Sequence, residues 1–519
     1  MPIAAFVAIL VGCASSGHLL DRPALESLPL NSPLRVSTLS DGDAWLRHYL
    51  VLGELDDAVE MLAPDGPEVV SDDVLYDLQA AIVLREAGEF GLSNRALERA
   101  EAEAEQRRVT SVSRTAGSWL LSEGLLSYVP SPGESAMIPY YRMMNHVALG
   151  DLEAAAVEAR RISALLLDSD DEGVRQCREH GMLHYLAALV FEAAFESNDA
   201  MVSLRQADAS FEHCPGGRAS APESLGADLL RLADILDFDE VADSAIARYP
   251  GLERGPAGAE LGEVVVVLER GFVSHLTEAA IHVPIFEEEI EDLESGDKDG
   301  IAAAAATVTA RLVNNFSELG QWGHSWDDHV GVQVAQALDG AHILKLAWPT
   351  VVDEGTMRRP SIRLRVGADT AEADPLGDIS AVIARELEET RTAMLARLVT
   401  RVVAKYLISR EVERKAEEEG GELLGFVTGR LANFAANESE RADTRSWTLL
   451  PDEVALVRLT LPAGTRDVSI ETLSPSGRRL KVIDLPQVEV AAGKITIVGA
   501  RLWKEDDGEN EPAIVLGRG

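Results

Sequence analysis

One sequence motif recurs in the first half of this 519-residue chain, and it limits that half to a helical fold. In the clear copies a turn residue precedes an acidic and then an apolar residue, and a small residue follows the turn by five positions. The copies are Gly53-Glu54-Leu55 with Ala58, Gly88-Glu89-Phe90 with Ser93, Gly150-Asp151-Leu152 with Ala155, and the weaker Asn198-Asp199 with Ser203 and Asp237-Phe238 with Ala242. Ala, Leu and Glu are abundant around them, and these residues favour helices. The pattern predicts consecutive helical hairpins over residues 40–250.

The motif resembles the turn of a tetratricopeptide repeat, in which a small residue near the start of the second helix lets the two helices approach closely. The best copy is ALGDLEAAAVEARRISALL at 148–166. Successive copies are 35, 62, 48 and 39 residues apart, so we expect lengthened and irregular hairpins. Because one hairpin cannot cover its own apolar face, the hairpins must stack, and a stacked array commonly offers a groove to protein segments. A helical bundle without a groove is the alternative.

Two of the three cysteines, Cys177 and Cys214, bracket one predicted hairpin with helices at about 178–196 and 200–213. Both thiols would lie at the open end of that hairpin, where an oxidising compartment would permit a disulfide. The same end carries His180, His184 and His213. The two cysteines could therefore ligate zinc with these histidines, or remain free thiols, instead of forming a disulfide.

The second half changes to strand-like patterns after a linker that contains Gly255-Pro256. The runs VVVVLERG, AAIHVPIF, HILKLAWPTVV and SIRLRVG predict strands. Helices are expected at 301–318 and 421–436, and a long amphipathic helix at 376–418. These segments indicate an α+β domain over 260–437.

From residue 448 the apolar residues fall in short runs separated by turn signals such as Pro475-Ser476-Gly477. Five short strands at this spacing predict a small β-sandwich over 448–503, followed by a disordered acidic tail at 504–519. The predicted fold class is therefore multidomain α+β, with N-terminal helical tetratricopeptide-like repeats, a middle α+β domain with long helices and a small C-terminal β-sandwich.

The N-terminal apolar run, Ile3 to Val11, is too short to span a bilayer, which takes about 20 residues, and it resembles the core of a signal peptide. Leu10-Val11-Gly12-Cys13 resembles the bacterial lipobox. This implies a signal peptide and lipobox at 1–13, acylation of Cys13 and a flexible tether at 14–39. Ala14 resembles the sorting position of outer-membrane lipoproteins, so we expect a lipid anchor on the periplasmic face. No basic residue precedes the run, and a core strand with an incidental cysteine is the alternative.

The chain is strongly acidic. Asp and Glu outnumber Lys and Arg by 87 to 47, which gives a formal net charge of −40. Such a surface repels phosphate backbones, so nucleic-acid binding is disfavoured. It also repels anionic lipid, and the expected contact with the membrane is through the acyl chains alone.

The stretch ERADTRSWTLLPDEV at 440–454, followed by VRLTLPAGTRDV, is too particular for a generic helix-to-strand junction. With AELGEVVVVLERG, which ends at Gly271, and NHVALGDLEAAAVEARR at 145–161, it resembles a family of uncharacterised bacterial lipoproteins. That family combines a tetratricopeptide-like N-terminal half with an ADTRSW-containing C-terminal half, and the resemblance covers roughly residues 40–503. It implies an envelope protein, in a genomic setting near lipoprotein activators of penicillin-binding proteins.

Within the ADTRSW motif, Asp443 and Arg445 can form a bidentate ion pair. Trp447 can pack under the first strand of the predicted sandwich. We expect the polar trio of the motif to cap the preceding helix and to fix the junction between domains. A ligand- or peptide-binding site at the junction is the alternative.

The sequence contains no nucleophile elbow, phosphate-binding loop or HExxH motif. His324-Ser325-Trp326-Asp327-Asp328-His329 combines imidazoles with carboxylates, but sequence neighbours rarely converge on one ion, so no metal site is predicted. His282 and His342 lie in apolar strands and are expected in the core.

The leading hypothesis is a non-enzymatic lipoprotein scaffold or adaptor without a cofactor or small-molecule substrate. It would bind a protein of the envelope, in envelope assembly or in the regulation of peptidoglycan synthesis. A second hypothesis is an envelope hydrolase or ligand-binding enzyme centred on the middle domain, which would require a pocket that gathers His282, His324 and His329. A third is a structural subunit of an envelope complex with no discrete ligand.

Overall fold

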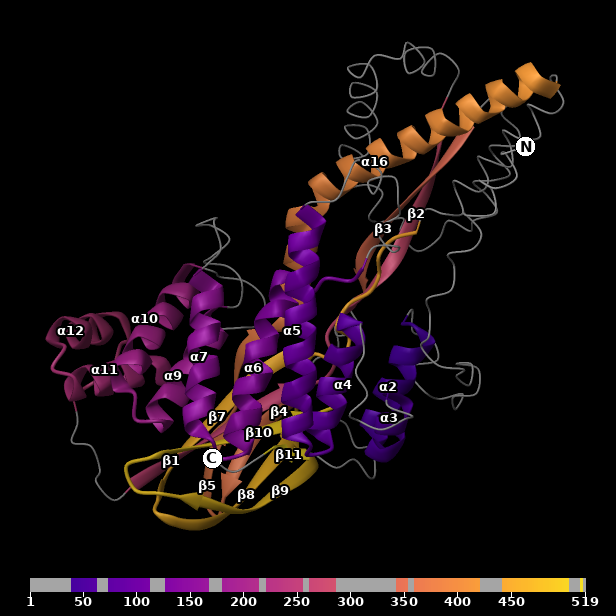
Figure 1. Cartoon of the computed structure of the whole chain (residues 1–519). Coiled ribbons are helices and arrows are strands. Elements are labelled where there is room, and N and C mark those ends of the chain that lie inside the picture. Colours follow the sequence, from indigo (N-terminus) through magenta and orange to yellow (C-terminus); the bar gives the residue numbers. More distant parts are fainter. Residues whose placement is uncertain are drawn as a thin grey trace.

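The computed structural model describes residues 39–62, 73–112, 127–167, 180–213, 221–254, 261–285, 342–352, 359–420, 441–503 and 514–516. Helices cover one face of a β-sheet, a second sheet lies on its other face, and a long helix extends away from this body (Figure 1). The predicted mixture of helical and β regions is confirmed. The predicted signal peptide, the lipobox and the helices predicted at 301–318 and 421–436 lie outside the described residues.

Paired helices occupy the first half of the described chain. They are α2 (Asp41–Leu52), α3 (Leu55–Leu62), α4 (Val74–Glu86), α5 (Phe90–Val112), α6 (Pro132–Ala148), α7 (Leu152–Leu167), α9 (His180–Ala193), α10 (Ser197–His213), α11 (Ser224–Ile235) and α12 (Asp239–Arg248). The two helices of each hairpin pack against each other, and so do neighbouring hairpins such as α7 and α9. The predicted stacking of helical hairpins is therefore present in the described residues.

The turns inside the hairpins share one backbone feature. Gly53, Gly88 and Gly150 have φ angles of 71°, 81° and 73°. This left-handed region is accessible to glycine without a steric cost, which explains why glycine is the turn residue of the motif. The small residue five positions after each glycine is buried, and its size lets the second helix lie close to the first. These residues are Ala58, Ser93 and Ala155.

The fourth copy of the motif was predicted three residues C-terminal to its actual position. Its turn residue is Phe195, with φ of 64°, and its buried small residue is Ala200. The fifth copy is placed correctly, because Asp237 has φ of 56° and Ala242 is buried. A bulky aromatic residue is uncommon in the left-handed region, so a search for glycine or asparagine passes over it.

The strands of the body form two sheets. The five-stranded sheet has the order β11-β10-β1-β7-β6, and the four-stranded sheet has the order β5-β4-β8-β9. In the five-stranded sheet β1 pairs in parallel with β10 and antiparallel with β7. The strands are β1 (Leu261–Arg270), β4 (Ser361–Val366), β5 (Asp369–Glu372), β6 (Asp374–Asp378), β7 (Glu453–Pro462), β8 (Gly464–Leu473), β9 (Arg479–Val490), β10 (Ile495–Leu502) and β11 (Ile514–Leu516).

The predicted division into a domain over 260–437 and a separate sandwich over 448–503 is not observed. β1 precedes this division but lies between β7 and β10, which follow it, and β4 pairs with β8. The sheets share one apolar core that contains Val264, Ile362 and Val457. Alternation shows which face of a strand is buried but does not show which strand lies beside it, so the sequence pattern could not reveal this mixing.

The prediction of a disordered tail is wrong for three of its residues. Ile514–Leu516 form β11, which pairs antiparallel with Gly499–Arg501 of β10. These three residues form an apolar run within an otherwise acidic and glycine-containing tail. Their backbone groups pair with β10, which would otherwise be an edge strand of the sheet.

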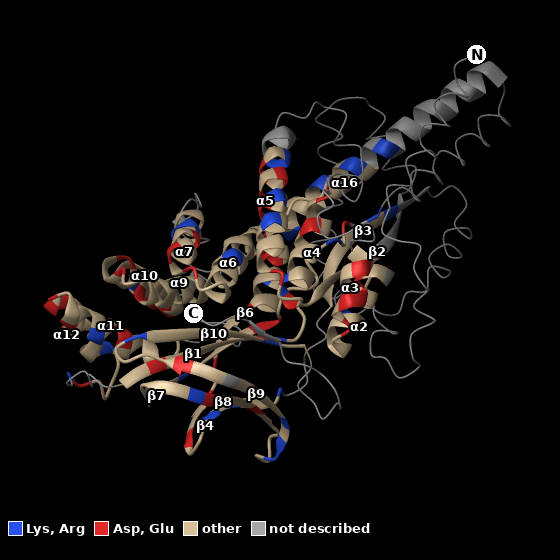
Figure 2. Ribbon diagram, turned by 60° about the horizontal axis from the view of Figure 1, so that its bottom comes forward, with Lys and Arg blue, Asp and Glu red and all other residues tan. Residues whose placement is uncertain are grey.

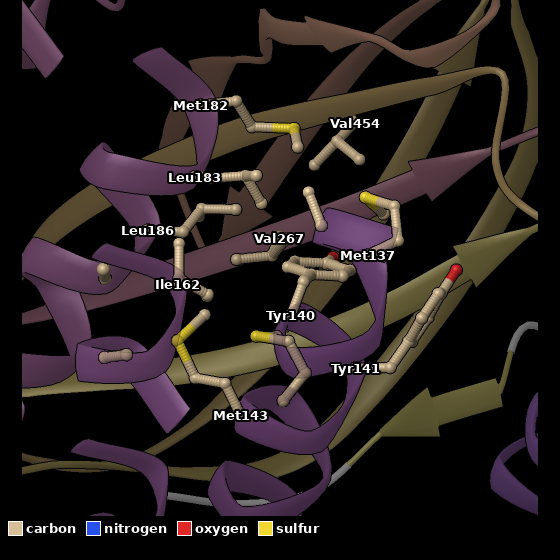
Figure 3. Close-up of a cluster of buried hydrophobic side chains, with 14 of the residues drawn as sticks. Met137, Tyr140, Tyr141, Met143, Ile162, Met182, Leu183, Leu186, Val267 and Val454 are labelled. Atoms are coloured by element: carbon tan, nitrogen blue, oxygen red, sulfur yellow. The ribbon is translucent and has the colours of Figure 1, made fainter. Parts of the chain in front are cut away.

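The other face of the five-stranded sheet packs against the first helices of the hairpins. Figure 3 shows side chains of α6 and α9 packed around Val267 of β1 and Val454 of β7, with Ile162 of α7 in the same cluster. α6 is buried along nearly its whole length, from Glu134 to Asn145. A fully buried large aliphatic or aromatic side chain contributes about 1.5–3 kcal/mol, so this layer is a major source of stability. The helices and the sheet therefore share one core.

A long helix and a two-stranded ribbon extend from the body (Figure 1). α16 (Ile379–Gly420) begins and ends close to the predicted bounds, and its first turns, with Ile379 and Ile383, join the main core. β2 (His275–Ile285) and β3 (His342–Val352) pair antiparallel, and α16 packs against β3. The long helix predicted from its apolar spacing is thus confirmed as one continuous element.

Candidate functional site

Charged side chains are buried between the helices and the five-stranded sheet, near both ends of β1. Because side chains alternate along a strand, Glu263, Val265, Val267 and Glu269 project to the face that the helices cover. The two valines pack into the core with the helices. The two glutamates instead meet arginine side chains, so the contact is apolar in its middle and charged toward its ends.

The Glu269 cluster consists of Glu269, Arg85, Arg501, Tyr140 and Tyr141. Arg501 Nη1 donates to Glu269 Oε2 at 3.0 Å, and the Tyr140 hydroxyl donates to Oε1 at 2.8 Å. The Tyr141 hydroxyl and Arg85 Nη2 reach the same carboxylate at 3.3 and 3.4 Å. Both arginines are fully buried, and Glu269 is 2% exposed. Each charge therefore depends on its partners, because water does not reach it.

Further bonds connect this cluster to the helical turns and to the sheet. Arg85 Nη1 donates to Asn145 Oδ1 at 2.6 Å, and Asn145 Nδ2 donates to Ser93 Oγ at 2.9 Å. On the sheet side, Arg501 Nη2 donates to the carbonyl of Gly271 at 2.7 Å, and its guanidinium lies 3.9 Å from the ring centroid of Trp503. The network thus joins α4, α5 and α6 to β1 and β10.

Glu86, the last residue of α4, is buried beside the Glu269 cluster. Burial raises the pKa of Glu86 to about 7, although the charges of Arg501 and Arg85 favour its ionised form. The carboxyl therefore titrates near neutral pH inside the contact between helices and sheet. No local pattern marks this residue, since Glu86 lies in an ordinary helical segment of the sequence.

The Arg458 cluster lies near the other end of β1. Arg458 of β7 donates from Nη2 to Glu263 Oε2 at 2.6 Å and to Asp228 Oδ1 of α11 at 3.2 Å. The Tyr185 hydroxyl of α9 donates to Asp228 Oδ2 at 2.7 Å. Burial opposes ionisation of Asp228, but the adjacent Arg458 outweighs it and holds the pKa of that carboxyl below its usual value. This cluster is less enclosed, with Glu263 22% exposed.

The ADTRSW residues are brought together in the described structure. Arg445 donates from Nε to Asp443 Oδ1 at 2.8 Å and from Nη2 to Oδ2 at 2.7 Å, which is a bidentate pair. Trp447 is fully buried, and its ring lies 5.6 Å from that of Tyr141 in α6. The tryptophan thus packs against a helix of the array, not only near the strand that follows it. The residues before 441, which the trio was expected to cap, lie outside the described part.

Glu134 completes this junction and was not identified from the sequence. Its carboxylate accepts bonds from the Trp447 backbone N–H at 2.6 Å, the Tyr128 hydroxyl at 2.8 Å and the Ser131 backbone N–H at 2.7 Å. Burial raises the pKa of Glu134, while these bonds favour its ionised form. Ser131 and Glu134 form a capping box at the start of α6, and the Ser-x-x-Glu spacing was the available signal.

Large apolar side chains are exposed at the turns within several hairpins. We call this set the turn edge; it consists of Leu52, Leu149, Phe195, Ile235 and Phe238. Their exposed fractions range from 43% at Leu52 to 71% at Phe195. Single exposed apolar residues are ordinary on a protein surface, but their recurrence at equivalent turns marks this edge of the array as a candidate for binding.

The other predicted residues are only partly described. Cys13, Cys177, Cys214, His324 and His329 lie outside the described residues, so acylation and the disulfide stay predictions. His180 begins α9 and His213 ends α10, at the predicted open end of their hairpin.

His184, His282 and His342 lie in described helices or strands. His184 is buried in α9, and burial lowers its pKa to about 4, so its imidazole is neutral at pH 7. His282 in β2 is opposite Lys345 of β3, and His342 is opposite Ile285 in the same ribbon.

No group of three or more His, Cys, Asp or Glu side chains in the described ranges is arranged to hold a metal ion. Among the same residues, no helix combines the length and apolar character needed to cross a membrane.

Comparison with known proteins assigns no family to the chain. No family model matches it, and no curated protein matches it. Two solved structures with weak similarity come from Podosopora anserina and contain the nearly identical TPR-like repeats of a protein described as a putative kinesin light chain, one of them as a single-substitution variant. Each is 13% identical to this chain, covers 40% of it and 90% of the solved chain, and superposes with a TM-score of 0.26.

Proposed function

We propose that this chain is a non-enzymatic protein-binding scaffold whose partner docks on the outer surface of the helical array. The observation that carries the proposal is the turn edge, where apolar side chains recur at successive hairpins and stay exposed. Exposed apolar residues that repeat along a rigid array can bind a partner at several points at once. The array is fixed on the sheet by buried contacts, so it would offer this edge without rearrangement.

The location of the docking surface differs from the groove expected from the sequence. In a helical-repeat array the face formed by the first helices is the usual candidate for a groove. Here α6 and α9 use that face to pack against the five-stranded sheet of the same chain (Figure 1). A partner is therefore proposed to bind the turn edge or the second helices, where Val157 and Val202 are also exposed.

The proposed setting is the bacterial envelope, with the chain anchored through acylated Cys13 to the periplasmic face of the outer membrane. The lipobox and the ADTRSW resemblance support this setting, in envelope assembly or in regulation of peptidoglycan synthesis. We expect radiolabelled palmitate to be incorporated into the wild-type chain and not into Cys13→Ala. Absence of label from the wild type would refute the anchor.

The scaffold function can be tested separately by cross-linking in intact cells. A photoreactive amino acid would replace Leu149 or Phe195 on the turn edge and, as a matched control, Val482, an exposed apolar residue on β9. We expect one dominant cross-linked partner from the turn-edge positions and none from Val482. Equal products from all three positions, or none, would contradict the proposal.

A further inference from the structure

The turns of the last two hairpins each carry exposed apolar side chains, at one end of the turn edge. Arg231 Nη2 of α11 donates to Glu192 Oε2 of α9 at 2.8 Å, so the C-terminal ends of these helices are neighbours. Phe195 follows Glu192 by three residues, and Ile235 follows Arg231 by four. Phe195, Ile235 and Phe238 are 71%, 60% and 43% exposed. We call these three side chains the terminal patch.

The terminal patch has an acidic border. Residues 234–243, DILDFDEVAD, contain five acidic residues and no Lys, Arg or His. Asp239 and Asp243 are 82% and 79% exposed. Arg254 lies 3.2–3.7 Å from these two carboxylates and from Asp234, so one cation faces three anions. Figure 2 shows the acidic residues on α12.

One contact within the chain places a cation against the patch. Lys494, in the turn between β9 and β10, places its ammonium 5.2 Å from the centroid of the Phe195 ring. An ammonium over an aromatic face is attracted by the negative charge of the ring face. The terminal patch therefore combines apolar surface, an aromatic face that already holds a cation, and neighbouring carboxylates.

We propose that the terminal patch binds a segment of a partner protein in which lysine or arginine residues alternate with large apolar residues. This inference rests on the proposed scaffold function and specifies the chemistry of its partner. The charge of the chain argues against a second copy as the occupant, because two molecules of formal charge −40 repel each other. A basic and apolar segment is attracted by the carboxylates and buries its apolar side chains on the patch.

The proposal can be tested with the full chain and a short fluorescent peptide of alternating lysine and leucine. Two further peptides have glutamate in place of lysine, or serine in place of leucine, and both should bind more weakly. We expect Ile235→Ser with Phe238→Ser to weaken binding about tenfold or more, as loss of a central apolar contact does. Val482→Ser is the matched control, because it removes an exposed apolar side chain from β9, outside the helical array.

Charge and location are tested in the same way. Asp239→Asn with Asp243→Asn should weaken binding several-fold in low salt and little in high salt, since salt screens exposed charges. A photoreactive group on the peptide should cross-link to residues 195 or 235–243 of the wild-type chain, as mapped by mass spectrometry, which does not depend on how a variant folds. Cross-links elsewhere, or equal loss of binding in Val482→Ser, would overturn the proposal.

Failure of this inference is distinguishable from failure of the scaffold function. If cells yield a dominant partner from Leu149 but the peptide does not bind the terminal patch, the scaffold stands and the basic partner is wrong. If neither the turn edge nor the terminal patch captures a ligand, both proposals fall.

Discussion

The two faces of the five-stranded sheet are made from alternate residues of the same strands, yet different interactions hold them. Toward the four-stranded sheet, β1 presents Val264, Val266 and Leu268 in an apolar contact, and only Arg270 at the end of the strand is charged, paired with Glu453 at 2.6 Å. Toward the helices it presents Val265 and Val267 between Glu263 and Glu269, so charged clusters flank an apolar centre.

The two contacts differ in the interactions that determine their geometry. Apolar packing is non-directional and tolerates substitutions that conserve volume. Buried ion pairs require specific partners, and a missing partner leaves a charge without water or counter-ion. We therefore expect the sheet-to-sheet contact to respond to side-chain volume, and the helix-to-sheet contact to respond to charge and pH, with an effect of salt only at its less enclosed end.

The largest effect is expected at Glu269. Glu269→Ala would leave Arg85 and Arg501 buried without their shared carboxylate and should lower the free energy of unfolding by about 3–5 kcal/mol. Chemical denaturation monitored by circular dichroism would measure the loss. Replacing all three charges (Arg85→Met, Glu269→Leu, Arg501→Met) should cost less than Glu269→Ala alone. A loss below about 1 kcal/mol for the single variant would mean that other groups or water compensate the arginines.

The apolar face should give a somewhat smaller loss with a different character. Leu268 is fully buried toward the four-stranded sheet, and Leu268→Ala should lower the free energy of unfolding by about 3 kcal/mol. The loss should be the same at pH 5 and pH 7, and in low and high salt, because no charge is removed. A clear dependence on pH or salt would break the distinction between the faces.

The pH dependence of the helix-facing side can be isolated with Glu86. Burial raises its pKa from an ordinary value of 4.5 to about 7, so the folded state binds the proton more tightly than the unfolded state. Its contribution to stability is complete below pH 4.5 and is lost as the pH rises through 7. The wild type should lose about 2 kcal/mol more than Glu86→Gln between pH 5 and pH 7. Parallel pH profiles for the two proteins would contradict the prediction.

The smallest effect is expected at the less enclosed end of the same face. Arg458→Met should lower the free energy of unfolding by about 1–2 kcal/mol, because Asp228 keeps its bond from Arg231 and Glu263 reaches solvent. The loss should shrink in high salt, unlike that of Glu269→Ala. Equal losses at Arg458 and Glu269 would show that enclosure does not distinguish the two clusters.

Part of the candidate site can be predicted from the sequence alone. The Asp443–Arg445 pair joins residues two apart, and the turn glycines repeat at a fixed distance from a small residue, so both depend on local sequence. Glu134 could have been found from its capping spacing to Ser131. The Glu269 cluster could not, because its charges come from α4, β1 and β10, and nothing near Arg85 in the sequence indicates Glu269 or Arg501.

The helical hairpins, the left-handed turns at glycine, the strand character of β1 and the single long helix α16 follow from local sequence. These depend on backbone preference and side-chain periodicity within a few residues. The position of β1 between β7 and β10, the covering of the first helices by the sheet and the role of Phe195 as a turn residue depend instead on long-range packing. Such outcomes depend on which distant surfaces meet, and a buried face is compatible with many partners until the whole core is assembled.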